Sequence, residues 1–114
     1  MNKIVIPFVK CNDWLSLYGI GEVGWGNGYA LLHARHPYFG RSYHDLDLNF
    51  SEELTYSDES KHLTEGYLGY WAIGFDTMHL GQNLSNCSEE VVRKKTDELC
   101  EIMFMTWLKY ERKI

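Results

Sequence analysis

The sequence predicts an α+β fold, in which an antiparallel sheet of about five strands packs against a long C-terminal helix. Short runs rich in β-branched and aromatic residues are spread over the first three quarters of the chain. Apolar residues recur at three- and four-residue steps in the last quarter, which is typical of an amphipathic helix. A length of 114 residues favours one domain spanning 1–114.

Composition excludes several classes of protein. Aromatic residues make up 15% of the chain, too many for intrinsic disorder, and no apolar run is long enough to span a membrane. The net charge of −5 disfavours nucleic acid as a partner, because phosphate binding needs a basic surface. Cys11, Cys87 and Cys100 are odd in number and widely spaced, which fits reduced thiols. The N-terminus lacks a secretory signal, so we expect a cytoplasmic protein with no membrane contact.

The first elements are a strand and a glycine-rich segment. Residues 3–9 predict a strand. Because proline cannot donate to a ladder, Pro7 indicates either a strand at the sheet edge or the end of a strand. Residues 11–19 are compatible with a short helical turn. The glycines of 19–24 match the dinucleotide-binding fingerprint, but Trp25-Gly26-Asn27-Gly28 follows them and would break the helix that this motif requires. We therefore favour a hairpin with its turn at Asn27-Gly28, between strands at about 20–26 and 29–35.

Three further strands are expected in the middle of the chain. Residues 43–50 alternate polar and apolar side chains, which suits a strand or ribbon. Residues 54–57 predict a short strand, followed by a polar loop at 58–66. Residues 67–75 predict a strand with Trp71, Ile73 and Phe75 on one face.

The C-terminal helix is predicted over residues 89–111, with Ser88 as its N-cap. Its apolar stripe is regular and consists of Val92, Thr96, Leu99, Met103, Trp107 and Tyr110. Ile102, Phe104, Met105 and Leu108 fall partly outside that stripe. A monomer would leave these side chains exposed, so we expect a homodimer or higher symmetric oligomer built on this helix.

A candidate site follows the strand at 67–75. Asp76 ends that strand and His79 lies three residues further on, in a loop closed by Gly81. Asp76 could orient His79 as a general base, or both could bind a metal together with His36 or His44. The structural alternative is that Asp76 accepts backbone N–H bonds and stabilises the turn, with His79 packed beneath it. We expect this backbone bonding, and we expect His79 to lie near the His36-Pro37 turn.

Aromatic and basic residues nearby suggest a bound ligand. Aromatic side chains on strands can stack on a base, although most are core residues. Arg35 and Arg41 flank the His36-Pro37 turn and are natural contacts for an anion. The expected ligand-binding residues are Arg35, His36, Arg41, Tyr43, Tyr56, Trp71, Asp76 and His79. No serine lies in a nucleophile-elbow context, and Cys11 and Cys87 have no local catalytic motif.

Four motifs follow one another over about residues 28–105: Gly28-Tyr29, His36-Pro37-x-x-Gly40-x-x-Tyr43, Leu54-Thr55-Tyr56-Ser57, and Trp71-x-x-Gly74-Phe75-Asp76-x-x-His79-x-Gly81. In these motifs and their order the chain resembles a widespread family of small phage and prophage proteins. This chain has Glu52-Glu53 where the family usually has two glycines, and Gln82 where an aspartate is usual. Without that carboxylate, and without a Cys/His pair at chelating spacing, we expect no tightly bound metal and no other cofactor.

The resemblance implies a phage accessory protein that acts in the bacterial cytoplasm, in a family without an established activity. We expect a non-enzymatic binder that counters host defence by sequestering a small nucleotide-type signal or by binding a host protein. The alternative is a small hydrolase that acts on a nucleotide or metabolite through Asp76 and His79. Turnover of added nucleotides distinguishes the two.

Overall fold

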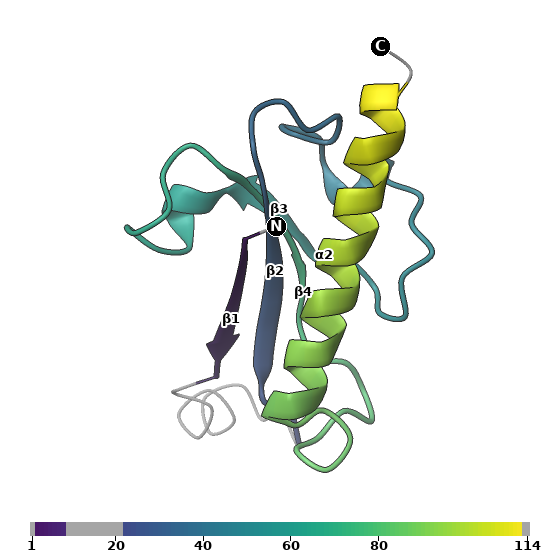
Figure 1. The fold of residues 1–114 in the computed structure, drawn as a ribbon. Coiled ribbons are helices and arrows are strands. Elements are labelled where there is room, and N and C mark those ends of the chain that lie inside the picture. The colour runs from purple at the N-terminus through teal and green to yellow at the C-terminus, as the bar shows by residue number, and fades with distance from the viewer. Residues whose placement is uncertain (1, 9–21, 113–114) are drawn as a thin grey trace.

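The computed structural model describes residues 2–8 and 22–112, which form a four-stranded sheet with one long helix across it (Figure 1). The predicted α+β class is confirmed, with four strands rather than about five. The elements are β1 (Lys3–Pro7), β2 (Gly26–Leu32), β3 (Tyr56–Glu59), β4 (Trp71–Phe75) and α2 (Glu89–Arg112), with short 3-10 turns at Tyr43–Asp45 and Ser60–His62.

The strands lie in the order β1-β2-β4-β3, and every neighbouring pair is antiparallel. Both positions that Pro7 indicates for the first strand are confirmed, because β1 ends at Pro7 and pairs with β2 alone among the described strands. At the centre of the sheet, Gly28 lies opposite Phe75 and Leu32 opposite Trp71. This register separates the two ends of the sheet by four strand residues, or about 13 Å.

The predicted hairpin turn at Asn27-Gly28 is wrong, because both residues lie inside β2. Gly28 faces α2, and a Cβ there would clash with the Thr96 hydroxyl and the Phe75 ring. The glycine is needed for the close approach of helix and strand, a role that local sequence does not distinguish from a turn. The predicted strands at 20–26 and 29–35 are replaced by β2, and residues 11–19 lie outside the described residues.

The predicted strand at 43–50 is also wrong: Tyr43–Asp45 is a 3-10 turn, and no strand forms in the segment after it. The alternation that suggested a strand instead directs Leu46, Leu48 and Phe50 against the core. The neighbouring strands are shorter than predicted or displaced. The predicted strand at 54–57 is β3, beginning at Tyr56, and the predicted strand at 67–75 is β4, beginning at Trp71.

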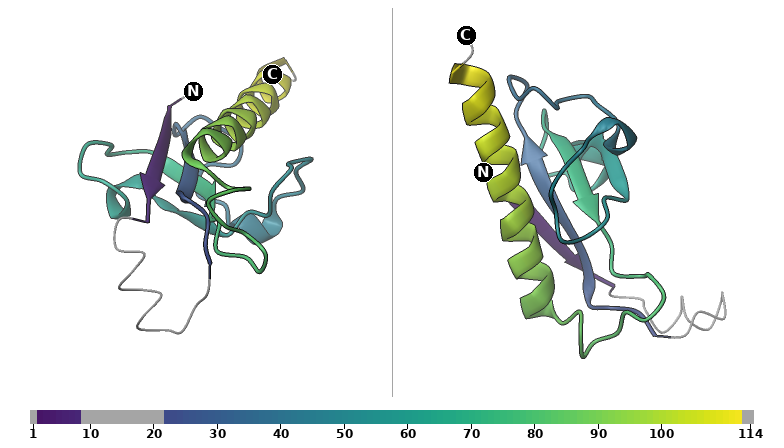
Figure 2. Two further views of the ribbon diagram at one scale, coloured as in Figure 1. Left: turned by 90° about the horizontal axis from the view of Figure 1, so that it is seen from below. Right: turned by 90° about the vertical axis from the view of Figure 1, so that its right-hand side faces the viewer.

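Helix α2 covers one face of the sheet (Figure 2). The Ser88 cap is confirmed, because its hydroxyl accepts the Val91 N–H at 3.3 Å. The predicted stripe is buried over its first four members and becomes exposed toward Tyr110, which is 43% exposed. The core between helix and sheet consists of Ala30, Leu32, Ile73, Phe75, Val92, Leu99, Cys100 and Met103. Within the described ranges, no helix has the length and apolar character needed to cross a membrane.

Candidate functional site

Asp76 and His79 meet in the loop that follows β4. The Asp76 carboxylate accepts the Met78 N–H at 3.0 Å, so the predicted backbone bond is confirmed. His79 Nε2 lies 3.5 Å from Asp76 Oδ1. The loop fixes this arrangement through the His79 N–H, which donates to Gln82 Oε1 at 2.9 Å. The two side chains are partly exposed, 30% for Asp76 and 37% for His79, so solvent and solutes reach them.

Strand register adds three more side chains to this pair. Successive side chains of a strand point to opposite faces of the sheet. Phe75 faces α2, so Gly74 and Asp76 on either side of it face away from the helix. Asn27 and Tyr29 of β2 lie on that face, and Tyr56 of β3 completes it. The rings of Tyr29 and Tyr56 meet edge to face, with centroids 5.2 Å apart.

We call these five residues the sheet-end cluster: Asn27, Tyr29, Tyr56, Asp76 and His79. Gly74 makes room for the cluster, because a Cβ there would clash with the Tyr29 ring that lies across it. Sequence reasoning found Tyr56, Asp76 and His79 and missed the two residues of β2. Asn27 and Tyr29 are two residues apart in one strand and therefore share a face. The predicted turn at Asn27-Gly28 left Asn27 outside any strand, so this relation was missed.

Burial keeps both tyrosines of the cluster neutral. Tyr29 is 6% exposed, and burial raises its pKa to about 12, although a hydrogen bond from Asn27 lowers it. Tyr56 and the Asp76 carboxylate add smaller repulsive contributions to the Tyr29 phenolate. Burial, followed by the charge of Asp58, raises the pKa of Tyr56 as well. At neutral pH both hydroxyls are therefore protonated and can donate a hydrogen bond.

The cluster contains two buried polar atoms without a partner. Among the described residues, Asn27 Oδ1 and His79 Nε2 are the buried side-chain nitrogen and oxygen atoms that make no hydrogen bond. The 3.5 Å approach of His79 Nε2 to Asp76 is an electrostatic contact rather than a hydrogen bond. Buried polar atoms in native proteins are nearly all paired, so two exceptions in one cluster mark it as unsatisfied.

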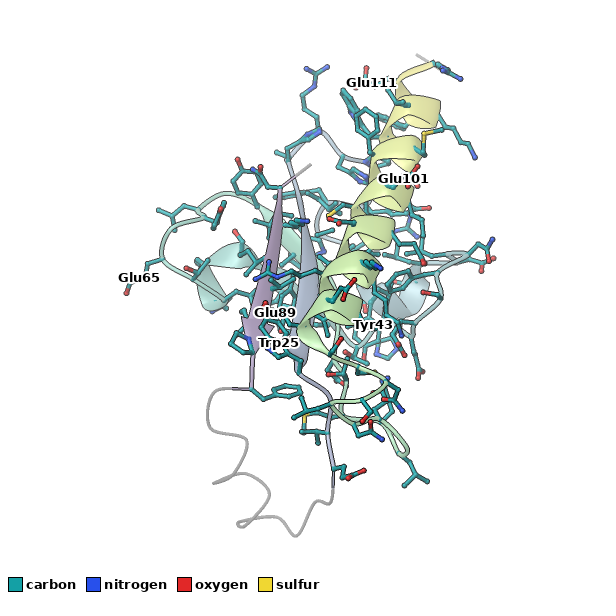
Figure 3. The ribbon with its side chains drawn as sticks, turned by 60° about the horizontal axis from the view of Figure 1, so that its bottom comes forward. Trp25, Tyr43, Glu65, Glu89, Glu101 and Glu111 are labelled. Carbon is teal, nitrogen blue, oxygen red and sulfur yellow. The ribbon has the colours of Figure 1, made fainter. Side chains whose placement is uncertain are left out.

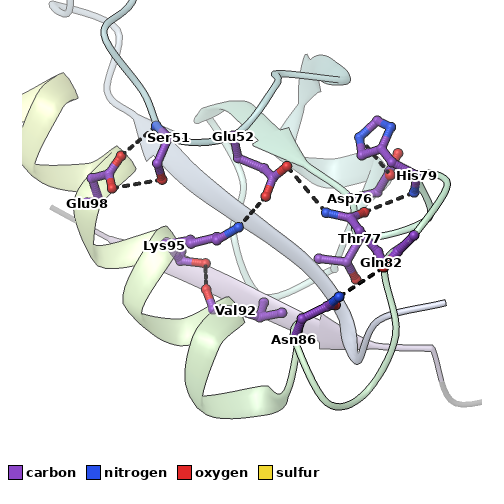
Figure 4. A network of polar contacts seen from close by, with 12 residues as sticks. Ser51, Glu52, Asp76, Thr77, His79, Gln82, Asn86, Val92, Lys95 and Glu98 are labelled. Atoms are coloured by element: carbon purple, nitrogen blue, oxygen red, sulfur yellow. Dashed lines mark hydrogen bonds and ion pairs between the residues drawn. The ribbon is translucent and has the colours of Figure 1, made fainter.

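A polar network ties the His79 loop to α2 (Figure 4). Gln82 holds the His79 backbone and donates to Glu52 Oε1 at 3.3 Å, and the other Glu52 oxygen pairs with Lys95 of the helix. The Glu52 and Lys95 side chains are only 13% and 25% exposed. Glu52 and Gln82, two positions at which this chain departs from the resembled phage pattern, are therefore in direct contact.

The expected proximity of His79 to the His36-Pro37 turn is wrong. His36 follows the end of β2 at Leu32, whereas His79 follows the end of β4 at Phe75. Because β2 and β4 are antiparallel, these two strand ends lie at opposite ends of the sheet. His36 is 3% exposed and belongs to the core. Its Nδ1 accepts the Tyr38 N–H at 3.0 Å, and its Nε2 donates to the Met103 carbonyl at 2.8 Å. Both nitrogens are satisfied, so His36 has no free position for a ligand.

The remaining expected ligand-binding residues are not members of the cluster. Arg35 is exposed and lies 3.6 Å from Glu111 of α2. Arg41 covers the Tyr38 ring, and its carbonyl accepts the Trp71 indole N–H at 2.9 Å. Tyr43 opens the 3-10 turn, with its N–H bonded to Ser57.

Two hollows of the described surface are lined by residues outside the sheet-end cluster. A groove of about 720 Å³ runs between the C-terminal half of α2 and residues 37–49. A smaller hollow of about 280 Å³ is lined by Tyr43, Phe50, Leu54 and Glu52, and Glu52 contacts Gln82 of the His79 loop. No group of three or more histidine, cysteine, aspartate or glutamate side chains in 2–8 and 22–112 is arranged to hold a metal ion.

Comparison of the chain with protein-family models, with curated proteins and with solved structures finds no match.

Proposed function

We propose that this chain is a non-enzymatic binding protein, and that a small nucleotide-type ligand binds at the sheet-end cluster. The observation that carries the proposal is the pair of unpartnered buried atoms, Asn27 Oδ1 and His79 Nε2. An unsatisfied buried polar group costs about 1–3 kcal/mol. A ligand that supplies the missing hydrogen-bond partners removes that cost, so the unliganded arrangement favours binding.

The chemistry of the other cluster residues suits a base. Tyr56 is partly exposed and offers a ring on which a planar heterocycle can stack. Asn27 accepts from an exocyclic amino group, as amide oxygens do in base recognition. The tyrosine hydroxyls remain protonated and donate to ring nitrogens or carbonyls. These groups together recognise the edge of a base without a lysine or arginine in the cluster.

The resemblance to phage and prophage proteins supplies the biological setting of the proposal. A small accessory protein that sequesters a nucleotide-type signal in the bacterial cytoplasm would counter host defence without catalysis. The second form of the same role is binding of a host protein through the acidic surface, which the net charge of −5 supports.

A small hydrolase is the second candidate function. Asp76 Oδ1 lies 3.5 Å from His79 Nε2, so the carboxylate can orient the ring while Nδ1 acts as a general base on water. The cluster holds no serine or cysteine, so this candidate requires direct attack by water. Binding is favoured over hydrolysis because burial raises the pKa values of both tyrosines and leaves them weak general acids for the leaving group.

Mass spectrometry of retained small molecules tests the proposal. Protein purified from bacteria is heat-denatured, and the released molecules are compared with those from the Asn27→Ala and Tyr56→Ala variants. We expect an unaltered nucleotide-type molecule from the parent chain and its loss from both variants. Arg35→Ala is the matched control, since Arg35 lies at the other end of the sheet and its loss leaves retention unchanged.

Incubation with cyclic nucleotides and ADP-ribose derivatives distinguishes the two candidates. Recovery of the added molecule intact, in stoichiometric amount, supports a binder. Catalytic conversion that disappears in His79→Ala establishes the hydrolase instead. If retention depends on Arg35 and not on Tyr56, the ligand site lies outside the sheet-end cluster.

A further inference from the structure

The side of α2 opposite the core has an apolar centre. Successive helix residues turn by about 100°, so Met105, two residues after the buried Met103, lies on the outward side. Met105 is 44% exposed, and Ile102 and Leu108 flank it at three-residue steps. We call this outward side, from 98 to 112, the outer seam.

Charges of opposite sign lie at the two ends of the outer seam. Glu98 and Glu101 precede Met105, and Lys109 and Arg112 follow it. Figure 3 labels Glu101 on this half of the helix. Glu101, Lys109 and Arg112 are exposed, and no ion pair within the described residues engages them.

The first turns of α2 pair their charges internally, in contrast to the outer seam. Glu89 pairs with Arg93 at 3.4 Å, and Glu90 pairs with Lys94 at 3.2 Å, both at four-residue spacing. In the seam, Glu101 and Lys109 are eight residues apart and cannot meet within one helix. Their charges are available to a partner.

The sequence of the outer seam is complementary to itself when read in reverse. Glu101, Met105 and Lys109 form a row at four-residue spacing, and such rows lie alongside one another when two helices cross at about −50°. An antiparallel copy, related by a two-fold axis at Met105, then brings Glu101 beside Lys109 of the copy, so acid meets base, and the pairing occurs twice because the axis is two-fold. Ile102 and Leu108 flank Met105 on its two sides and pack around the contact on the axis.

Glu98 lies outside the row that meets the copy, and its carboxylate accepts from the Ser51 N–H and hydroxyl at 2.9 Å each. The groove of about 720 Å³ runs beside the seam, between Ile102 and Met105 on one side and Tyr38 and Leu48 on the other. It gives the side chains of a second helix a recess on one flank of the seam.

We propose that α2 pairs antiparallel with α2 of a second copy of this chain, in a register centred on Met105. The occupant is a second copy rather than an unrelated protein because the row Glu101-Met105-Lys109 is complementary to itself under one two-fold operation. This pairing goes beyond the ligand-binding proposal and does not depend on it.

Charge reversal tests the register. Sedimentation equilibrium is expected to give the parent chain twice the 13.4 kDa of the monomer. Glu101→Lys and Lys109→Glu each replace two attractive pairs by two repulsive ones, and each should weaken the dimer about tenfold or more. Lys61→Glu, a similar charge change on the turn at Ser60–His62, should leave the dimer intact.

Recombination of the two reversals gives the sharper result. An equimolar mixture of the Glu101→Lys and Lys109→Glu chains has attractive pairs at both sites, so a heterodimer should form with an affinity near that of the parent. The double variant is again self-complementary and should recover dimerisation. A parallel pairing predicts no recovery in the double variant, because residues of the same number would meet.

Cross-linking locates the axis. Met105→Cys should form a disulfide with its copy under mild oxidation, because the two residues lie on the axis. Glu101→Cys should not cross-link above the parent chain, since its copy is displaced by eight residues, or about 12 Å, beyond disulfide reach. A monomeric parent chain, or a dimer that tolerates both charge reversals, overturns the proposal.

Discussion

His36 and His79 lie at opposite ends of the same sheet, and their surroundings differ in almost every respect. His36 is 3% exposed and uses both ring nitrogens, one toward Tyr38 and one toward the helix carbonyl of Met103. His79 has a 37% exposed side chain, a nitrogen with no hydrogen-bond partner and a carboxylate 3.5 Å away. The first imidazole joins a loop to a helix, whereas the second has unused bonding capacity in a loop.

The contrast shows which histidine has hydrogen-bonding capacity left for a ligand. A residue with all its bonds satisfied in the core contributes to stability, and a residue with unmet bonds beside a charged partner is available to a ligand. Both histidines occur in motifs that suggested one shared site. Only the register of the central strands separates them.

Alanine at the two histidines should give the largest difference. His36→Ala opens a cavity and leaves the Met103 carbonyl and the Tyr38 N–H without these partners, so we expect a loss of about 2–4 kcal/mol in unfolding free energy. His79→Ala should change it by less than about 1 kcal/mol, because the side chain is partly exposed. Urea denaturation measures both. Equal losses would remove the distinction between the two ends.

Glycine-to-alanine changes test how tightly the His79 end is packed. Gly28→Ala drives a methyl group into Thr96 and Phe75, and Gly74→Ala drives one into Tyr29 and the β2 backbone. Each should cost about 1–3 kcal/mol. Gly66→Ala is the control, since its nearest neighbour is 4.0 Å away. Equal melting temperatures for the three variants would contradict the close packing of Gly28 against the helix and of Gly74 against Tyr29.

Lys95→Met tests the link between α2 and the His79 loop. The change leaves the Glu52 carboxylate, 13% exposed, without its cation, so we expect a loss of about 1–2 kcal/mol. Lys94→Met is the matched control, because the Lys94–Glu90 pair is about three-quarters exposed and contributes little. Faster amide exchange at His79 in Lys95→Met, and not in Lys94→Met, would establish the link directly.

Acidification should lower the free energy of unfolding through His36, by less than the substitutions above. Burial lowers the pKa of His36 below its ordinary 6.5, although the bond to the Met103 carbonyl opposes the shift. Below pH 6.5 the unfolded chain therefore binds more protons at this residue than the folded chain, and stability falls as pH falls. The contribution is complete above that pH. His36→Gln cannot titrate and should lessen the decline between pH 7 and 5.

His44→Gln serves as the control for that measurement, because His44 is exposed in the 3-10 turn. The pH dependence of its unfolding should match that of the parent chain. A parent chain whose stability is flat from pH 7 to 5 would contradict the role assigned to His36.

Local patterns predicted what local interactions determine. The Ser88 cap and the apolar steps from Val92 to Met103 defined α2, because capping and helical periodicity act within a few residues. Pro7 correctly indicated the edge or the end of a strand. The backbone bond of Asp76 was predicted for the same reason, since an aspartate commonly accepts from the N–H two residues later.

Long-range pairing was not predictable from those patterns. Asn27-Gly28 has the composition of a turn, and only the approach of Thr96 from a helix some seventy residues later explains the glycine. The alternation in 43–50 reflects packing of Leu48 and its neighbours against the core without a strand partner. The sheet-end cluster draws on two strands and on the loop after a third, so its composition depends on register rather than on any single motif.

The position of β1 beneath α2 has a consequence for synthesis of the chain on the ribosome. β1 is made first and α2 last among the described elements, and the two are joined by an ion pair between Lys3 and Asp97. Until α2 emerges, Ala30 and Leu32 have no helix to cover them. The nascent sheet therefore presents an uncovered apolar face for several seconds at ordinary rates of translation, an interval in which chaperones can engage it.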